Sequence, residues 1–464
     1  MLQTLKNAWR TKDIRSKLLF TFLILVLYRI GTVIPVPFVN AHDFAGSFSG
    51  TILDYLNLLS GGSLGQATLF ALGVSPYINA SIIIQLLAVV FPKLGELSKT
   101  DKKKMGFITR VTTVVLAVIT AVGYYFLLAD SALTPAATSG IGDNAWFYGI
   151  VIVTCYVAGA SLVMWLADRI NEHGIGNGVS MILFANIICA LPQQCIAMYQ
   201  LIRGTFAYTE YKAGYAILSI LFVLFLIALI IGMTMFVIFI TGSERRIPVQ
   251  YAKRVVGRKM YGGQSSNLPI KLNMTGVMPV IFASSIVSLV PTILMLCGVT
   301  SATEGFWGWL TRFIGSDGFV YPIVFFLLIV AFAYFYTQIT FNPVEVANNL
   351  KKQGGAIPGI RQGRPTSDYI KKILNKITLA GALFLSVVAV LPVIAGPHVI
   401  QHLIEWILSG SSLSSTENVV AAAKSYSSVF TFGGTSLIIV VGVALETFRE
   451  LEAQLTMRNY KGFL

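Results

Sequence analysis

The chain has 464 residues, of which 55% are hydrophobic and 12% are charged, and its formal net charge is +14. Soluble domains carry about 25% charged residues, so this composition excludes an ordinary soluble protein. Several apolar runs exceed the roughly 18 residues that mark a membrane-spanning helix. They are continuous rather than alternating, which excludes a membrane β-barrel. The chain is predicted to be an all-α polytopic membrane protein.

The chain begins with a basic segment followed by an apolar one, as a signal peptide does. No small-residue cleavage site follows, so we interpret it as a retained first span. A hydropathy window of about 20 residues predicts ten spans. They cover residues 18–38, 73–91, 107–129, 147–167, 178–198, 214–240, 275–297, 320–340, 374–395 and 430–447.

Basic residues are concentrated in alternate loops, which predicts the orientation of the spans. The richest segments are the N-terminal one, the loop around residues 93–104, and two long loops at 241–274 and 341–373. The opposite side carries only Arg203, Lys212, Arg312 and Lys424. Both termini are therefore predicted to lie in the cytoplasm. This asymmetry also explains most of the positive charge without nucleic-acid binding.

The stretch "GGSLGQATLFALGVSPYINASIIIQLL", residues 61–87, cannot be one straight span. Its first part allows about ten helical residues, which rise only some 15 Å, half of a bilayer core. A half-membrane helix must be buried in protein or in a water-filled cavity. The sequence predicts a short re-entrant helix that enters from outside. The residues alone leave open whether it moves or is a static hairpin.

Catalytic and cofactor motifs are absent from the sequence. No GxxxxGK[ST] phosphate loop occurs, and the four cysteines show no metal-ligand spacing. "HGIGNG" at 173–178 indicates a tight turn rather than a dinucleotide site. Asp168 and Glu446 are predicted at the inner ends of spans rather than at the midplane, which disfavours an ion-coupled transporter. Arg29, inside the first span, is expected to bond to backbone or a helix end, or to reach the interface.

Residues 61–87 closely resemble a signature of the SecY family, the central channel subunits of the Sec protein translocase. "WLADRINEHGIGNGVSMILFANI" (165–187) resembles the other hallmark of this family. Further similar stretches cover residues 245–286, 341–370 and 432–446, so the resemblance extends over nearly the whole chain. It implies two inverted five-helix halves, residues 1–200 and 201–464, related by a pseudo-two-fold axis.

The resemblance also implies where the channel is closed. The pore ring would consist of Val74, Ile78, Val179, Leu183, Ile281 and Ile439. Val74/Ile78 and Val179/Leu183 are spaced i,i+4, so each pair shares a helix face. Several ring positions are isoleucine in the family, and the three replacements here remain aliphatic. The plug, about residues 61–72, would include Ser63, Leu64, Gly65, Gln66, Ala67, Thr68, Leu69, Phe70, Ala71 and Leu72.

By the same resemblance, the two long basic loops dock the SecA motor and the ribosome. The residues assigned to these contacts are Arg254, Arg258, Lys259, Arg361 and Arg364. The implied protein is a non-enzymatic channel without cofactor or metal, which passes unfolded polypeptides and releases transmembrane segments into the lipid. Its expected partners are SecE, SecG, SecA, the ribosome and signal peptides, in the bacterial inner membrane. The alternative is an ion-coupled transporter of the inverted-repeat type. The outer loop at 396–429 is longer than in many bacterial relatives.

Overall fold

The structure is a computed structural model. It describes residues 2–39, 57, 60–131, 145–208, 213–251, 254–256, 259–261, 265–296, 320–395 and 434–461. The long outer loop 396–429 and Arg258 lie outside the described residues.

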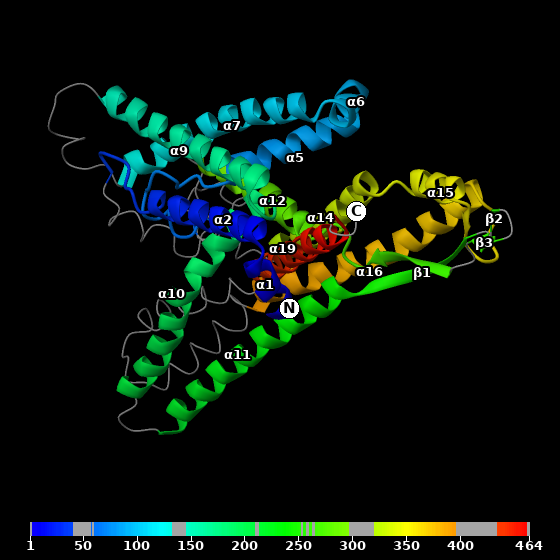
Figure 1. Cartoon of the computed structure of the whole chain (residues 1–464). Coiled ribbons are helices and arrows are strands. Elements are labelled where there is room, and N and C mark those ends of the chain that lie inside the picture. The colour runs from blue at the N-terminus through cyan, green and yellow to red at the C-terminus, as the bar shows by residue number, and fades with distance from the viewer. Residues whose placement is uncertain are drawn as a thin grey trace.

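Helices dominate the described part of the chain (Figure 1). In chain order they are α1 (Leu2–Arg10), α2 (Lys12–Gly31), α5 (Ser75–Val90), α6 (Pro92–Thr100), α7 (Lys102–Ser131), α9 (Ala145–His173), α10 (Gly178–Tyr208), α11 (Ala213–Gly242), α12 (Met278–Leu296), α14 (Val320–Thr340), α15 (Pro343–Lys352), α16 (Arg364–Ala395) and α19 (Gly434–Lys461). Each of the ten predicted spans falls on one of these helices, so the predicted helical architecture is confirmed.

Several helices are longer than the apolar runs that predicted them. α16 begins ten residues before the predicted span, and α19 continues to Lys461, well past residue 447. By length and composition, five helices in the described ranges can cross a membrane, or six when α5 and α6, bent by 117°, are counted as one broken span. The polar residues that flank the apolar runs of α16 and α19 thus continue the same helices. The predicted boundary at residue 200 falls inside α10.

The basic loop 241–274 forms strands that sequence reasoning missed. β1 (Glu244–Tyr251) pairs antiparallel with β4 (Ser265–Lys271) and with β5 (Gly355–Ala356), giving the order β4-β1-β5. A separate hairpin joins β2 (Arg254–Val256) to β3 (Lys259–Tyr261). In β1, Ile247 and Val249 are buried between exposed neighbours, the alternation that a half-buried strand requires.

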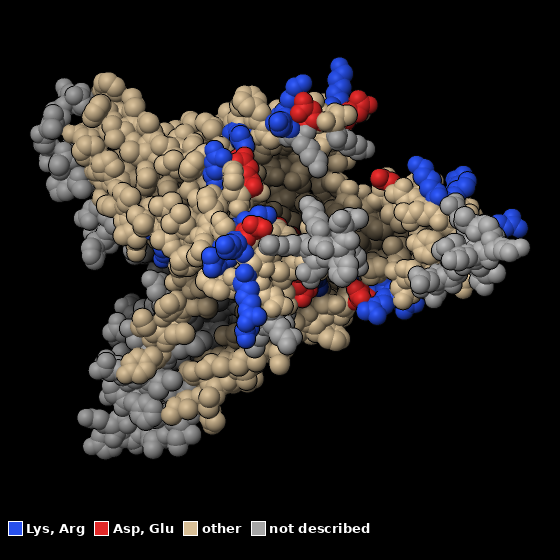
Figure 2. All heavy atoms as spheres, viewed as in Figure 1, with Lys and Arg blue, Asp and Glu red and all other residues tan. Residues whose placement is uncertain are grey.

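The two basic loops share one small core, which we call the loop module. It contains Ile247 and Val249 of β1, Ile270 of β4, Leu350 of α15, and Ile357, Ile370 and Leu374 around the start of α16. Figure 1 shows β1, α15 and the start of α16 projecting together from one end of the helix bundle. Figure 2 shows coloured charged side chains at this end, over α6, and in the middle of the face around α1, α2 and the end of α9, whereas the far ends of α7 and α9 are largely tan.

Candidate functional site

The six predicted ring residues come from four helices that meet at the centre of the bundle. Val74 and Ile78 lie at the start of α5, Val179 and Leu183 in the first two turns of α10, Ile281 in the first turn of α12, and Ile439 in the second turn of α19. All six are between 1% and 8% exposed and belong to one hydrophobic cluster. Segments up to 365 residues apart in the sequence are thus packed against each other.

A cavity of about 170 Å³ opens beside this cluster. Ile78, Val179 and Ile281 line it together with polar side chains and aromatic rings, the complete lining being Tyr77, Ile78, Ser81, Gln85, Asn171, Asn177, Val179, Ser180, Met278, Ile281, Phe282 and Tyr336. Ser81 and Gln85 of the lining follow Ile78 along α5 toward α6, and Tyr336 lies in the last turns of α14, shortly before α15. Its lining mixes polar, aromatic and aliphatic side chains, and we call this cavity the vestibule.

The prediction of a short helix over residues 63–72 is wrong. The chain from Ser60 to Val74 forms consecutive turns instead. Gly61, Gly62, Ala67 and Gly73 have positive φ values, which a right-handed helix does not allow. Backbone hydrogen bonds also attach this segment to the end of the first span, from Leu69 N to Ile34 O at 2.9 Å and from Val36 N to Ala67 O at 3.1 Å. These bonds compete with the intrahelical ones.

Residues of α2 and α9 hold this segment in place, and Asn186 of α10 supports one of them. Tyr28 stacks on Phe70 with 5.6 Å between ring centroids, and Asn186 Nδ2 donates to the Tyr28 hydroxyl at 3.0 Å. Arg29 Nη1 donates to the Gly61 carbonyl at 3.3 Å, so the expectation that Arg29 bonds to backbone is confirmed. On α9, a Cβ at Gly159 would overlap the carbonyl oxygen of Leu69. The segment is thus built into the N-terminal half of the chain.

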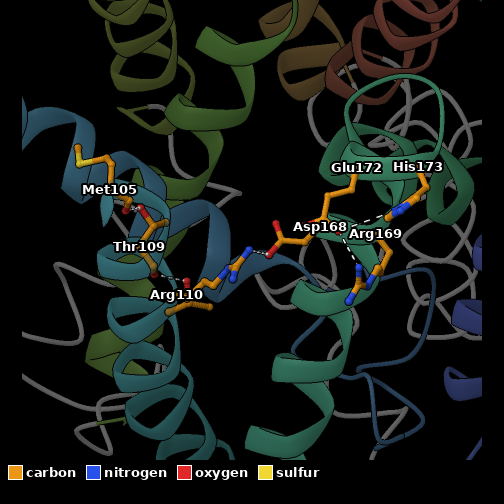
Figure 3. A network of polar contacts seen from close by, with 8 residues as sticks. Met105, Thr109, Arg110, Asp168, Arg169, Glu172 and His173 are labelled. Atoms are coloured by element: carbon orange, nitrogen blue, oxygen red, sulfur yellow. Dashed lines mark hydrogen bonds and ion pairs between the residues drawn. The ribbon is translucent and has the colours of Figure 1, made fainter. Parts of the chain in front are cut away.

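The membrane-edge carboxylate Asp168 forms an ion pair that joins two helices (Figure 3). Arg110 of α7 approaches Asp168 of α9 to 2.8 Å. One turn further on, Arg169 pairs with Glu172 at 2.7 Å, and the guanidinium of Arg169 lies over the Trp165 ring. This arrangement satisfies Asp168 locally, as expected of a structural ion pair at the end of a span rather than of an ion-carrying group at the midplane.

The residues predicted for docking lie in the loop module. Arg361 is exposed in a glycine-rich turn, and Arg364 is the exposed first residue of α16. Gly359 and Gly363 on either side have φ values of 77° and 98°. Thr366 Oγ1 donates to the Arg361 carbonyl at 2.8 Å, which fixes the turn. Arg254 and Lys259 belong to the β2–β3 hairpin. The turn that carries Arg361 and Arg364 is therefore held on the packed core of the loop module.

The loop module is also attached to the last helix. Arg449 of α19 donates at 3.0 Å to the carbonyl of Thr241, which lies in the last turn of α11, three residues before β1 of the module. Partial burial, and then the nearby Arg449 guanidinium, lower the pKa of Lys271 on β4. The base of the loop module is therefore in contact with α19 through Arg449. The same helix carries the ring residue Ile439.

The family model for SecY matches residues 68–448. The chain belongs to the SecY family. The protein translocase subunit SecY of Streptomyces coelicolor is 40% identical over 478 aligned residues, which cover 100% of both chains. The SecY subunit of Mycobacterium tuberculosis is 40% identical over 480 residues, again with 100% coverage of both. These SecY relatives share the full length of the chain.

Solved structures of protein-conducting channels have the same fold. One is 17% identical with a TM-score of 0.56, over 95% of this chain and 92% of that chain. Sec61 in the canine ribosome–channel complex from the endoplasmic reticulum is 16% identical with a TM-score of 0.53, over 95% and 92% of the two chains. The SecY-family fold predicted from the motifs is thereby confirmed. The functions of individual residues stay predictions.

Proposed function

We propose that this chain is the channel-forming subunit of a Sec protein translocase, which passes unfolded polypeptides across the membrane and releases apolar segments into the lipid. The observation that carries the proposal is the convergence of aliphatic side chains from α5, α10, α12 and α19 beside a solvent-open vestibule. A constriction of apolar side chains excludes ions when it is empty, because it dewets. It also has no fixed polar geometry that would select one substrate.

The pore ring in this proposal consists of Val74, Ile78, Val179, Leu183, Ile281 and Ile439. Their common burial and the lining of the vestibule by three of them support this assignment. A plug near residues 61–72 would add a second seal. Since Gly61, Leu69 and Phe70 are bonded or packed against the N-terminal half, displacement of the plug would have to break these contacts.

The loop module supplies the docking surface for the energy source. Arg361 and Arg364 stand exposed beside the exposed basic residues Lys351 and Lys352, which suits phosphates of ribosomal RNA or an acidic face of the SecA motor. The ribosome-bound Sec61 channels of the same fold support the ribosome as a partner. SecE and SecG complete the complex, and the chain itself catalyses no reaction.

We place the protein in the bacterial inner membrane with both termini in the cytoplasm. The charged residues gathered around the loop module and α6 support this orientation, because loops rich in Lys and Arg stay inside. The vestibule then faces the cytoplasm, the side from which an unfolded precursor arrives.

Translocation by purified components tests the proposal. Vesicles containing this chain with SecE, SecG, SecA and ATP should protect an unfolded secretory precursor from added protease, whereas vesicles lacking this chain should not. An ion-coupled transporter would instead show saturable, gradient-dependent uptake of a small solute. Absence of protected precursor from vesicles with verified incorporation would contradict the channel function.

A further inference from the structure

The turn between α9 and α10 positions two of the proposed ring residues. It spans residues 174–177, and Val179 and Leu183 follow in the first two turns of α10. Gly176 has a φ of 83°, and a Cβ at Gly178 would overlap the carbonyl oxygen of Ala167. The turn is therefore packed directly on α9, and the position of α10 depends on how the turn is held.

Three side chains from three helices accept hydrogen bonds from the backbone of this turn. Thr21 Oγ1 of α2 accepts from Ile175 N at 3.1 Å, and Asn171 Oδ1 of α9 accepts from Gly178 N at 2.7 Å. Glu450 Oε2 of α19 accepts from Gly176 N at 2.8 Å. Backbone N–H groups that precede a helix have no intrahelical acceptor, and a carboxylate there is further favoured by the helix dipole. Glu450 is the charged member of the set.

The carboxylate of Glu450 is itself held by neighbours on both sides. Gln454 Nε2 donates to Glu450 Oε1 at 3.2 Å, and Lys17 Nζ of α2 donates to Gln454 Oε1 at 3.3 Å. Leu451, 3% exposed, packs in one cluster with Ile175 of the turn. A chain of polar contacts thus runs from α2 through α19 to the start of α10, over a small apolar core.

The same helix, α19, carries the ring residue Ile439. Glu450 lies eleven residues further along, which is about 16 Å of helix. Its bond to Gly176 therefore joins the helix that carries Ile439 to the turn from which Val179 and Leu183 extend. Close-packed interiors transmit strain, so we expect loss of this bond to move the start of α10 relative to α19, although Thr21 and Asn171 still hold the turn.

We propose that Glu450 is a positioning residue for the pore ring, which holds the start of α10 in register with α19 through the Gly176 N–H. This inference rests on the proposed channel function and on the proposed ring. Glu450 touches no translocating substrate in this role. It acts through the turn, and its effect is on the tightness of the resting seal.

Resting ion conductance of the complete translocase in planar bilayers tests the role. Glu450→Ala removes a charge-assisted hydrogen bond, and we expect about a tenfold rise in conductance per incorporated channel. Glu450→Gln retains an acceptor oxygen at the same distance and should stay within about twofold of the parent. Glu452→Ala, at an exposed position on the same helix, makes the same change of charge and should leave conductance unchanged.

The outcomes separate this inference from the channel proposal. A triple variant of the ring, Ile78→Ser with Leu183→Ser and Ile439→Ser, is recorded in the same bilayers. If the triple variant conducts and Glu450→Ala remains silent, the positioning role is overturned while the ring stands. If neither variant conducts, the assignment of the pore ring is wrong, and the positioning role of Glu450 is overturned as well. Equal conductance of Glu450→Gln and Glu450→Ala, or a leak in Glu452→Ala, would also overturn it.

A purely structural role for Glu450 predicts a different result. It would lower the abundance or melting temperature of Glu450→Ala without raising conductance per channel. If Glu450→Ala fails to assemble, Glu450→Asp serves instead. Its carboxylate is withdrawn by one methylene from Gly176 N, so a leak above that of the Gln variant supports positioning, and a conductance equal to that of the Gln variant contradicts it.

Discussion

Arg29 of α2 donates a hydrogen bond to the carbonyl oxygen of Gly61 across 3.3 Å, and so attaches the proposed plug region to the first span. A Cβ at Gly61 would lie 3.0 Å from Arg29 Nη1 and 3.0 Å from Asn186 Oδ1. The backbone of Gly61 is thus enclosed by polar side chains of α2 and α10. Burying a charged side chain in an apolar span costs free energy. Here the hydrogen bond from Arg29 to the non-helical segment at Gly61 offsets part of that free energy.

Removal of this anchor should loosen residues 60–66. Ser63 is 1% exposed, so a cysteine in the variant Ser63→Cys should react slowly with a small thiol reagent. Adding Arg29→Ala should raise the labelling rate about tenfold, since a hydrogen bond to a charged group stabilises by about 1.5–3 kcal/mol. Arg15→Ala, at an exposed position of the same helix, is the control. Equal rates in all three backgrounds would show that Arg29 does not hold the segment.

The ring prediction concerns the barrier itself. Combined replacement of Ile78, Leu183 and Ile439 by Ser should wet the constriction and give steady ion conductance through the resting channel, because the dewetted barrier requires apolar side chains. Translocation of a secretory precursor should persist, with weaker dependence on its signal sequence. Planar-bilayer recording at matched incorporation measures the leak. An electrically silent triple variant would mean that these residues only pack helices together.

The close contact between α9 and the turn segment should be intolerant of a methyl group. Gly159→Ala places a Cβ on the Leu69 carbonyl, where backbone rather than a flexible side chain must yield, and overpacking of this kind costs about 3 kcal/mol. A clear fall in melting temperature is expected. Gly232→Ala on α11 meets nothing within 4 Å and should leave the melting temperature unchanged or slightly higher. Similar behaviour of the two variants would contradict the packing.

Charge reversal in the loop module should separate docking from folding. Arg361→Glu should reduce SecA-driven translocation at least tenfold while abundance stays normal, because its side chain is exposed and its backbone alone is bonded to Thr366. Lys93→Glu changes the net charge equally at another exposed position on α6 and should have little effect. Translocation assays with matched amounts of both variants measure the difference. Unchanged activity of Arg361→Glu would exclude this contact.

The topology can be tested with single cysteines and a membrane-impermeant reagent. Cysteines at positions 101, 260 and 362 should react only from the cytoplasmic side, and those at 138 and 412 only from outside, because the loop charges set the orientation. Labelling of intact cells against inverted vesicles decides each site. Reversal at any one position would require a different assignment of spans.

The parts of the fold that depend on local composition were predictable. Hydropathy is summed within about 20 neighbouring residues, so the ten helices followed from the sequence, as did their family through the motifs around residues 61–87 and 165–187. For the isolated Arg29 in an apolar run, the sequence left open a backbone partner, a helix end or the interface, and the structure shows the backbone partner. The alternation of apolar Ile247 and Val249 with polar residues was a further local signal for β1. We missed this strand because the many basic residues led us to interpret the segment only as a loop.

What the sequence by itself determined is therefore the number of spans, the basic loops and the family. The tertiary structure alone decided that residues 60–74 form turns, because their backbone bonds to Ile34 and Val36 compete with helical ones. It also decided that side chains as distant as Ile78 and Ile439 share one core, and that Glu450 reaches Gly176. These contacts join residues from about thirty to more than three hundred positions apart. No local pattern of hydropathy or charge determines which partner a side chain meets when the helices pack.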